Sequence, residues 1–424
     1  MAAIKISLPE NNTLSGEVIL EYSKSESNRV LLIRYLSVEP FIISGVSNAE
    51  DTILLRKILD ADEQCKGRDE MRIYNVNHAG TAMRFLCAYF ASKEGNYFLT
   101  GSTRMLERPI GPLVEALRGL GADIQYAERE GFPPLIIRGN KLEGGRISIG
   151  SNISSQFISA LMLIAPSLPS GLKLSLNGEI VSYSYIHMTA SVMRRFGIQV
   201  MEHENEIVVC SGHYKSEKQK EYIIEADWSA ASYFYALASL LPGTEIILSG
   251  LHAGSIQPDA VCADLFVSFG VQSVHGENEV KISGHSVSPL PHFEYDFSLC
   301  PDLVQTMVVV CAAKKIPSKF TGVSTLRIKE TDRISALKTE LKKFKVDLDI
   351  VDDNSFVIRP EDADFSIPDI VIDTYNDHRM AMSFTALSLV CPNIIIKNPE
   401  VVTKSFPQFW NEISKTGLTT GVIN

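Results

Sequence analysis

The sequence repeats one pattern along almost its whole length: an amphipathic segment, a small turn and then an alternating strand. The copies are LRGLGADIQY, MRRFGIQVME, FVSFGVQSVH, LKKFKVDLDI and, more weakly, NEISKTGLTT. Their turn positions are Gly121, Gly197, Gly270, Lys345 and Gly417, which gives a spacing of about 72 to 76 residues. This period is too long for a solenoid and suits a compact unit of several strands and two helices. A shorter sixth unit is expected near residues 50–75.

The turn positions predict how the helices end. Glycine adopts the left-handed backbone conformation that ends a helix without a steric cost, and four of the five turns have it. Lys345 lacks that ease, so we expect its helix to end differently. Strand-like runs alternate with helix-like runs, which predicts an α/β fold. The strand-like runs are 136–138, 173–176, 246–248, 356–358 and 394–396, and the helix-like runs are 156–164, 230–241, 303–313 and 380–389.

A chain of 424 residues with 45% hydrophobic content is long enough for two or more domains. The polar stretch 211–222 follows three of the repeats, so we expect it to connect two lobes of three units each. The net charge of −10 disfavours a general binder of nucleic acid or acidic membranes, which would carry a basic surface. Anion binding, if it occurs, is expected to be local.

The N-terminal residues lack a signal-peptide pattern, and the apolar runs are too short to span a bilayer, so a cytoplasmic location is expected. The seven cysteines are scattered, odd in number and mostly within apolar runs. This predicts buried thiols rather than disulfides.

The segment RIKETDR, from Arg327 to Arg333, packs three cations, two carboxylates and a hydroxyl into seven positions. If residues 329–333 form a helix, Lys329 and Arg333 share one face, with Glu330 one position around. Such a face can hold an anion and a proton donor together. Taken alone, the run is more typical of a solvated helix with weak ion pairs of about 0.2–0.5 kcal/mol each.

Three further polar clusters precede helix-like apolar runs. SKSESNR spans 23–29 and HAGTAMR spans 78–84; both offer hydroxyls, backbone N–H groups and cations to a phosphate or carboxylate. NISSQF, at 152–157, offers neutral hydrogen-bonding groups from Asn152 to Gln156, with Ser151 just before them. A simple helix cap is the ordinary alternative in each case.

Three other clusters are rich in cations. GSTRMLERPIG, at 101–111, places Arg104 and Arg108 four apart, and guanidinium groups bind carboxylates and phosphates through two hydrogen bonds. NDHRMAM spans 376–382 and KSFPQF spans 404–409. In the ordinary alternatives Glu107 neutralises one arginine, and Asp377 forms a salt bridge with Arg379.

Bringing these cations together without an anion would be repulsive, whereas each charge-assisted hydrogen bond to a phosphate is worth about 1.5–3 kcal/mol. If they converge, their ligand is strongly anionic. The sequence has no GxGxxG, Walker, GxSxG, CxxC or HExxH motif, so a mechanism without nucleotide, metal or other cofactor is expected. The cations concerned are Lys24, Arg104, Lys329, Arg333, Arg379 and Lys404.

Together the motifs resemble the 5-enolpyruvylshikimate-3-phosphate synthase (3-phosphoshikimate 1-carboxyvinyltransferase) family. SKSxSNR, AGTAMR, RMxxRPI, SSQ, KETDR, NDHRMAM and KSFP occur here in that family's order. The resemblance implies a two-lobed, inside-out α/β barrel of six βαβαββ units, three per lobe, with the active site in a cleft that closes on its ligands. The N-terminal lobe, on the shikimate 3-phosphate side, would be 19–224. The C-terminal lobe, on the phosphoenolpyruvate side, would be 1–18 plus 225–424.

Carried over by motif position, the resemblance implies two sets of substrate-binding residues. Shikimate 3-phosphate would be held by Lys24, Ser25, Arg29, Ser154, Ser155, Gln156, Ser182, Tyr185, Asp302 and Lys329. Phosphoenolpyruvate would be held by Lys24, Gly80, Thr81, Arg104, Gln156, Arg333, Arg379 and Lys404, with Arg84 and His378 as further candidates.

The family reaction belongs to the shikimate pathway of aromatic amino-acid and chorismate biosynthesis. The 5-hydroxyl of shikimate 3-phosphate attacks C2 of phosphoenolpyruvate while C3 gains a proton, and C3 then loses a proton as phosphate leaves a tetrahedral intermediate. A carboxyl close to C3 and a base close to the hydroxyl are required. Glu330 and Asp302 fit these roles, and Lys24 is a candidate for assisting proton transfer or balancing the charge of the leaving phosphate. The sequence leaves open which group moves each proton.

Three places depart from the usual family pattern: Glu21-Tyr22 stand where Pro-Gly is common, His78 replaces an Asn, and Thr325 stands where an Asn is sometimes found. One alternative is a UDP-N-acetylglucosamine enolpyruvyl transferase, although that family typically has a cysteine in the loop corresponding to 101–110 and lacks KETDR. Others are an RNA 3′-phosphate cyclase and a non-catalytic polyanion-binding protein. We expect a monomer with two small-molecule substrates and neither nucleic-acid nor membrane partners.

Overall fold

The computed structural model describes residues 2–8, 12–65, 70–150, 154–178, 182–215 and 221–423. The chain divides into two compact units: unit 1 comprises Met1–Ser23 and Glu225–Asn424, and unit 2 comprises Lys24–Ile224. The first crossing therefore lies after Ser23 rather than after residue 18. The reason is that the backbone up to Ser23 still pairs within unit 1, where Tyr22 bridges Ala226 and the Ser23 N–H donates to the Glu225 carbonyl at 2.8 Å.

Unit 2 contains two four-stranded sheets that are built in the same way. In each, two parallel strands are followed by a hairpin whose second strand pairs antiparallel with the second parallel strand. The strands of the first sheet are β4 (Arg72–Asn75), β5 (Gly95–Thr100), β6 (Asp123–Tyr126) and β7 (Leu135–Gly139), and those of the second are β8 (Gly145–Gly150), β9 (Leu172–Asn177), β10 (Val200–His203) and β11 (Glu206–Val209).

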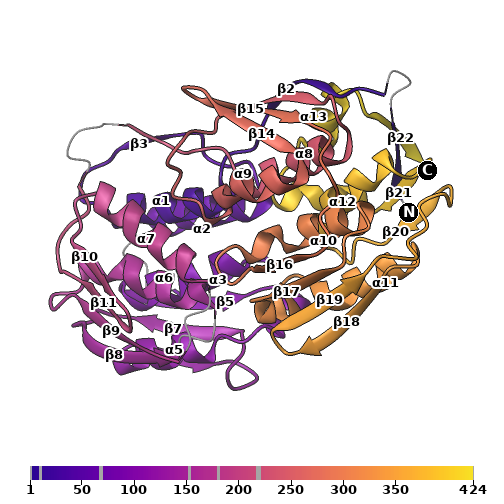
Figure 1. Cartoon of the computed structure of the whole chain (residues 1–424). Coiled ribbons are helices and arrows are strands. Elements are labelled where there is room, and N and C mark those ends of the chain that lie inside the picture. Colours follow the sequence, from indigo (N-terminus) through magenta and orange to yellow (C-terminus); the bar gives the residue numbers. More distant parts are fainter. Residues whose placement is uncertain are drawn as a thin grey trace. The chain divides into compact units, whose positions relative to one another are not determined.

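Helices connect the strands of unit 2. In Figure 1, α3 and α6 lie beside each other, and both are buried along most of their length. A parallel pair, β3 (Ile42–Ser44) and β12 (Glu221–Ile223), accompanies α1 and α2 as the reduced sixth repeat. The strand expected at the end of that repeat, β4, instead belongs to the next sheet. The helices are α1 (Lys24–Leu36), α2 (Glu50–Gln64), α3 (Gly80–Ala91), α4 (Thr103–Leu106), α5 (Gly111–Gly119), α6 (Ser155–Ile164) and α7 (Tyr183–Arg195).

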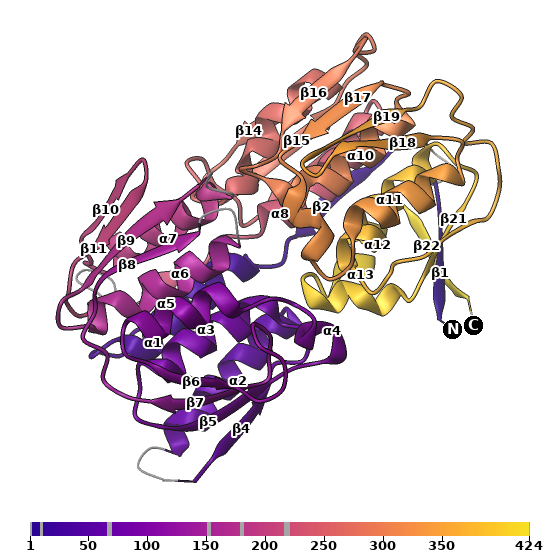
Figure 2. The same ribbon diagram turned by 90° about the horizontal axis from the view of Figure 1, so that it is seen from below.

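Unit 1 contains three four-stranded sheets, in the orders β14-β15-β13-β2, β16-β17-β19-β18 and β20-β21-β1-β22. Their strands are β1 (Ala3–Ser7), β2 (Ser15–Ile19), β13 (Glu245–Ser249), β14 (Val271–His275), β15 (Glu279–Gly284), β16 (Phe293–Asp296), β17 (Ser318–Thr321), β18 (Asp347–Asp352), β19 (Ser355–Arg359), β20 (Ile370–Ile372), β21 (Ile394–Lys397) and β22 (Thr419–Ile423). Figure 2 shows the indigo β1 beside the yellow β21 and β22, so the start of the chain completes a sheet formed by its end.

Three helices of unit 1, α8, α10 and α12, are buried along almost their whole length. The α10 segment is mostly apolar and its two polar residues, Gln305 and Thr306, are also buried, whereas the strands alternate between buried and exposed positions. The sheets therefore cover a core of helices. The α-helices of unit 1 are α8 (Trp228–Leu240), α9 (Cys262–Leu265), α10 (Val304–Ala313), α11 (Arg333–Lys342), α12 (His378–Phe384) and α13 (Phe409–Lys415), and α9, α11 and α13 are partly exposed.

The turn after each repeated helix uses the left-handed conformation. Gly121, Gly197, Gly270 and Gly417 have φ values of 98°, 78°, 88° and 105°. The expectation that the helix before Lys345 ends differently was wrong, because Lys345 itself adopts φ 59°. Its N–H donates to the Lys342 carbonyl at 3.1 Å, so the same turn forms with a less suitable residue.

The seven cysteines are free thiols in the structure; Cys65 and Cys210 are half-buried, and the other five are buried, as expected. Within the described residues, no helix combines the length and the apolar character needed to cross a membrane.

Lys345→Gly is expected to stabilise unit 1 by about 1 kcal/mol, because a side chain in the left-handed region costs about that much. The ion pair between Lys345 and Asp364 is exposed and contributes little. Thermal unfolding measures the effect. The control is Lys338→Gly, an exposed position in the middle of α11, which should lose about 1 kcal/mol. A melting temperature lowered equally in both variants would contradict the account.

Candidate active site

In unit 2, the predicted ligand-binding residues lie at helix N-termini that meet at one end of a helix layer. Arg29 of α1 connects them: its Nε donates to Thr189 Oγ1 at 2.7 Å, and its Nη2 donates to Ser159 Oγ at 3.3 Å and to the Tyr185 carbonyl at 3.2 Å. These partners lie in the first two turns of α6 and α7, so α1, α6 and α7 begin close together. N–H groups at helix N-termini favour a bound anion.

Arg29 also fixes the backbone of Ser25, because its Nη1 donates to the Ser25 carbonyl at 2.7 Å. The side chain is buried, and burial lowers the pKa of Arg29 to about 10, so it remains charged at neutral pH. Ser25 and Tyr185 occupy the first turns of their helices, and Ser182, in the left-handed conformation, precedes α7. The predicted shikimate 3-phosphate set of unit 2 is therefore largely gathered in one place.

The N-termini of α3 and α6 are joined by a direct contact. The Gln156 Nε2 donates to Thr81 Oγ1 at 3.1 Å, and the Ser154 hydroxyl caps α6 by accepting from the Gln156 N–H at 3.3 Å. Ser155, between them, is buried. Gly80 opens α3 under the Arg108 guanidinium, and a Cβ atom added there would lie 2.6 Å from Arg108 Nη1. Ser151 and Asn152 lie outside the described residues.

Lys24 has a carboxylate partner that the sequence did not reveal. Its Nζ lies 3.1 Å from Asp51 Oδ2, and His78 Nε2 lies 3.5 Å from Glu50 Oε2 and 3.9 Å from Asp51 Oδ1. Asp51 is in the first turn of α2, 27 positions after Lys24. The departure at His78 thus places a titratable ring beside the partner of Lys24.

Two of the arginines predicted as ligands, Arg84 on α3 and Arg104 on α4, differ in environment. Arg84 is buried; its Nη1 donates to the Gly80 carbonyl at 3.2 Å and its Nη2 to the Pro109 carbonyl at 2.9 Å, so it fastens the 101–110 loop to α3. Arg104 is exposed on α4, and its Nη1 lies 3.1 Å from Glu107 Oε2. The ordinary alternative, in which Glu107 pairs with one arginine, is thus present.

In unit 1, the helix expected over 329–333 does not form. A 3-10 helix covers Ser324–Ile328, Lys329 is extended, and α11 begins only at Arg333. The cause is Asp332, whose Oδ1 accepts hydrogen bonds from the N–H groups of Ile334 and Ser335, both at 3.1 Å. An aspartate in this role marks the start of a helix, so the residues before it belong to a loop.

Arg333 is the best-enclosed cation of the cluster, with 1% of its side chain exposed. Its Nε donates to Asp377 Oδ2 at 2.7 Å, its Nη1 to Asp302 Oδ1 at 3.1 Å, and its Nη2 to Glu330 Oε2 at 3.1 Å. One guanidinium thus positions three carboxylates from separate segments. The structure differs from the ordinary alternative of a salt bridge between Asp377 and Arg379. The Asp377 carboxylate pairs with the Arg333 guanidinium, and its Oδ1 accepts a hydrogen bond from the backbone N–H of Arg379 at 2.9 Å.

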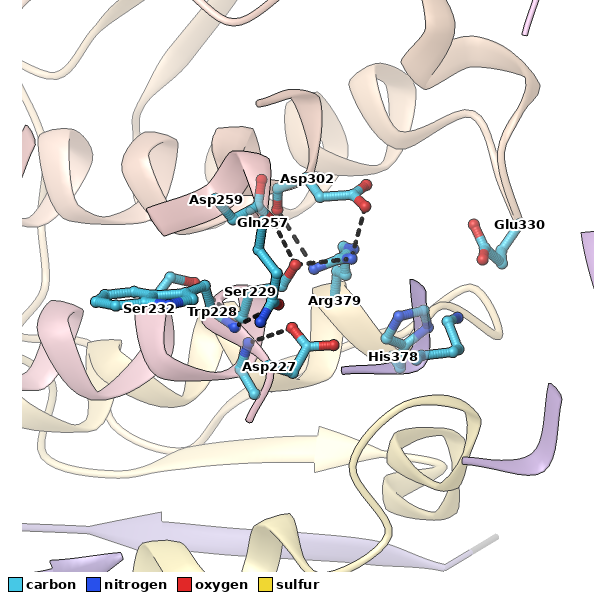
Figure 3. Close-up of polar contacts among 12 residues, drawn as sticks. Asp227, Trp228, Ser229, Ser232, Gln257, Asp259, Asp302, Glu330, His378 and Arg379 are labelled. Carbon is cyan, nitrogen blue, oxygen red and sulfur yellow. Dashed lines mark hydrogen bonds and ion pairs between the residues drawn. The ribbon is translucent and has the colours of Figure 1, made fainter. Parts of the chain in front are cut away.

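Arg379, in the first turn of α12, lies beside the carboxylate of Asp302 (Figure 3). Its Nη2 is 2.8 Å from Asp302 Oδ2 and 3.4 Å from Ser229 Oγ, and its Nη1 is 3.3 Å from the Tyr233 hydroxyl. Ser229 and Tyr233 belong to α8. Asp227 caps the N-terminus of this helix, because its side chain accepts a hydrogen bond from the Ala230 N–H. The sequence pattern gave no sign of these two hydroxyls, which lie about 150 positions from Arg379 along the chain.

The cations determine the charge state of Asp302. Burial by itself raises the pKa of this carboxyl, but Arg379, Lys329 and Arg333 together outweigh burial and hold the pKa well below its usual range. Asp302 is therefore ionised at any pH near neutrality and can only accept hydrogen bonds.

The remaining candidates lie around this cluster. His378 begins α12 and is buried. Lys404, at the end of a 3-10 helix over Pro399–Lys404, donates to the Asn376 carbonyl just before Asp377. In the described part of the chain, no group of three or more His, Cys, Asp and Glu side chains could hold a metal ion.

Comparison with known proteins identifies the family to which this arrangement belongs. A family model described as EPSP synthase (3-phosphoshikimate 1-carboxyvinyltransferase) matches residues 9–413. The chain belongs to the EPSP synthase family. A 3-phosphoshikimate 1-carboxyvinyltransferase of Bacteroides fragilis (strain YCH46) is 41% identical over 406 residues, covering 96% of each protein. One from Colwellia psychrerythraea is 33% identical over 422 residues, covering 95% of this chain and 97% of the relative.

Solved structures share the fold. The EPSP synthase from Acinetobacter baumannii superimposes with a TM-score of 0.79 at 21% identity, over 100% of both chains. The enolpyruvyl transferase NikO from Streptomyces tendae has a TM-score of 0.77 at 14% identity, over 100% of this chain and 99% of that one. The family resemblance and the two-lobed enolpyruvyl transferase fold predicted from sequence are thus confirmed.

Asp377→Ala is expected to lower the stability of unit 1 by about 3–5 kcal/mol, because it removes a partner of the buried Arg333. The matched control is Asp373→Ala, four positions earlier, whose half-exposed side chain pairs with Lys343 and Lys397 and should cost less than about 1 kcal/mol. Thermal unfolding of both variants decides the matter. Equal losses would contradict the role given to Arg333.

Proposed function

We propose that this chain transfers the enolpyruvyl group of phosphoenolpyruvate to the 5-hydroxyl of shikimate 3-phosphate and releases phosphate, using the two clusters described above. The observation that carries the proposal is the Arg333 cluster, in which two guanidinium groups and three carboxylates from the KETDR, NDHRMAM and Asp302 segments come together within one unit. Family membership supports the reaction type.

In unit 2, the helix N-termini are proposed to hold shikimate 3-phosphate. Its phosphate would accept hydrogen bonds from backbone N–H groups at the starts of α6 and α7, with the Ser154 and Ser155 hydroxyls beside them. Lys24 and Ser25 open α1, and Gln156 and Thr81 lie where a second anion could reach α3. Arg29 holds these helix starts in register and supplies a buried positive charge.

In unit 1, Arg379, Arg333 and Lys404 are proposed to bind the carboxylate and phosphate of phosphoenolpyruvate. Arg104 is also proposed to bind phosphoenolpyruvate. Arg379 is better placed than Arg333 to reach a ligand, because its side chain is less deeply buried. Planar guanidinium groups bind a carboxylate through two parallel hydrogen bonds. Lys329 is proposed to contact shikimate 3-phosphate together with Asp302.

The two carboxylates of the cluster are proposed to act differently. Asp302 has a pKa well below its usual range, so it is a weak base and serves mainly to accept a hydrogen bond from the 5-hydroxyl and orient it. Glu330 is partly exposed on the loop before α11, where Arg333 Nη2 holds its Oε2 at 3.1 Å. Its other oxygen is the proposed donor and acceptor for the proton at C3.

We also propose that the chain works as a monomer in the cytoplasm and needs no nucleic acid. The net charge of −10 supports the last point, because polyanion binders carry a basic surface. The location is supported by the metabolic role of the family.

The direct test is phosphate release from phosphoenolpyruvate by the purified chain. We expect release only when shikimate 3-phosphate is also present, and none when UDP-N-acetylglucosamine replaces it. Release that does not depend on shikimate 3-phosphate would overturn the proposal, as would its absence with both substrates.

Glu330→Gln is expected to lower kcat by at least about 100-fold, because general acid–base groups contribute about 10²–10⁴ in rate. A glutamine oxygen can still accept from Arg333, so both KM values should change less than about threefold. Initial rates of phosphate release give all three constants. Glu361→Gln, an exposed glutamate between β19 and β20, is the control and should behave as the wild type. Normal turnover by Glu330→Gln would remove Glu330 from the proton transfer.

A further inference from the structure

Asp259 is a buried carboxyl group that the proposed reaction does not use. It lies in a short 3-10 helix, Pro258–Val261, packed against α8, and only 2% of it is exposed. Its Oδ2 accepts a hydrogen bond from the Ser229 hydroxyl, and among the described residues none donates a hydrogen bond to its Oδ1. Because an ionised carboxylate is costly to bury, a group of this kind calls for an explanation.

The backbone around Asp259 is fixed relative to the start of α8. Gln257 lies two positions before Asp259. Its Nε2 donates to the Ala226 carbonyl at 2.7 Å and to Glu225 Oε2 at 2.9 Å. Its Oε1 accepts from the Trp228 N–H at 3.2 Å. These bonds hold the Asp259 segment against the residues that precede Ser229, so the distance between the carboxyl and the hydroxyl is set by both backbones.

The Ser229 hydroxyl lies between Asp259 and Arg379, as Figure 3 shows. A serine hydroxyl has one proton to donate, and here that proton goes to the Asp259 carboxylate. The oxygen lone pairs therefore face Arg379 Nη2, 3.4 Å away. An ionised Asp259 thus orients the Ser229 hydroxyl so that its oxygen can accept a hydrogen bond from Arg379. Asp259 acts on the orientation of the Arg379 guanidinium through this hydroxyl.

The anchors of Arg379 are of two kinds. Asp302 pairs with its Nη2 at 2.8 Å and carries a negative charge, so it competes with any carboxylate that arrives as a ligand. The hydroxyls of Ser229 and Tyr233 are neutral. They can keep the Arg379 guanidinium in place while the carboxylate of a ligand replaces Asp302 as its partner. Ser229 can do so only while its proton is directed elsewhere.

We infer that Asp259 is a positioning residue for phosphoenolpyruvate: through the Ser229 hydroxyl it orients the Arg379 guanidinium and so strengthens binding of the substrate's carboxylate. This inference rests on the proposed function, in which Arg379 binds that carboxylate. It concerns binding rather than proton transfer, because no reacting atom is near Asp259 in the scheme. The matching effect on shikimate 3-phosphate should be small.

Other charged and titratable groups also face Asp259. They are Asp227 at the start of α8, Asp302 before α10, Arg379 on α12, and the thiols of Cys262 and Cys300. Burial raises the pKa of Asp259 to about 7, and Asp302 acts in the same direction, while Arg379 opposes them. Assays at about pH 8 therefore keep Asp259 mostly ionised and test the hydrogen-bonded arrangement described above.

The experiment measures kcat and both KM values by phosphate release for Asp259→Ala, Ser229→Ala, the double variant and Asp259→Asn. An asparagine keeps an acceptor oxygen for Ser229 and removes the charge, so it separates the hydrogen bond from simple electrostatics. Asp264→Asn, exposed on α9 a few residues away, is the matched control. Thermal unfolding of each variant reports any general damage to unit 1.

We expect Asp259→Ala and Ser229→Ala each to raise KM for phosphoenolpyruvate by about 5- to 10-fold, the effect of one hydrogen bond, with kcat and the other KM changed less than about twofold. The double variant should be no worse than either single one, because both remove the same connection. Asp259→Asn should recover most of the loss, and Asp264→Asn should match the wild type.

Unchanged KM for phosphoenolpyruvate in the alanine variants would overturn the inference, as would equal increases in both KM values or additive effects in the double variant. If Asp259→Asn is as impaired as Asp259→Ala, the charge of the group matters and the hydrogen-bond mechanism is wrong. If the wild-type chain releases no phosphate, the proposed function and this inference both fail. Wild-type release with normal Asp259 variants refutes the inference alone.

Discussion

The cluster in unit 1 depends on the guanidinium group of Arg333. Removing a guanidinium from water is costly, and the cost is met here by three carboxylates, from Asp377, Asp302 and Glu330, that surround it on separate sides. The same guanidinium holds the carboxylate of Glu330, the proposed proton carrier, and Asp302 pairs with both Arg333 and Arg379. One buried cation thus connects the residues to which the proposed chemistry is assigned.

In both units, polar side chains hold the N-termini of several helices close together. In unit 2, Arg29 connects the starts of α1, α6 and α7, and Gln156 joins α6 to α3. In unit 1, Arg379 connects the starts of α8 and α12 with the segment before α10. Several helices of each unit thus begin close to one another, and backbone N–H groups at helix N-termini favour an anion.

Much of the fold follows from the sequence because local signals determine it. The strand-like runs fall within β7, β9, β13, β19 and β21, and the apolar runs at 156–164 and 303–313 lie in α6 and in α10 with the short helix before it. The run at 380–389 was less regular, since α12 ends at Phe384 and continues as a 3-10 helix over Thr385–Leu389. No helix forms over 329–333 because Asp332 caps α11, and the spacing of the charges does not reveal this cap.

Local sequence patterns do not reveal which carboxylates pair with the cations. Asp377 lies 44 positions from Arg333 and Asp51 lies 27 from Lys24, and no local pattern reports which carboxylate folds back onto which cation. The sequence-based argument that the cations would repel one another without a ligand was therefore incomplete. In unit 1, Arg333 and Arg379 already face carboxylates, so an incoming anion must compete with Asp302 rather than fill a purely positive site.

The surrounding cations Arg379, Lys329 and Arg333 hold Asp302 ionised despite its burial. Carbon-13 NMR of the side-chain carboxyl groups, with the Asp302 signal assigned by its loss in Asp302→Asn, tests this in the ligand-free protein. An ordinary aspartate has a pKa of about 3.9 and would be about half protonated near pH 4. Because the pKa of Asp302 lies well below this value, its signal is expected to stay constant from about pH 8 to about pH 4. A signal that titrates within that range would contradict it.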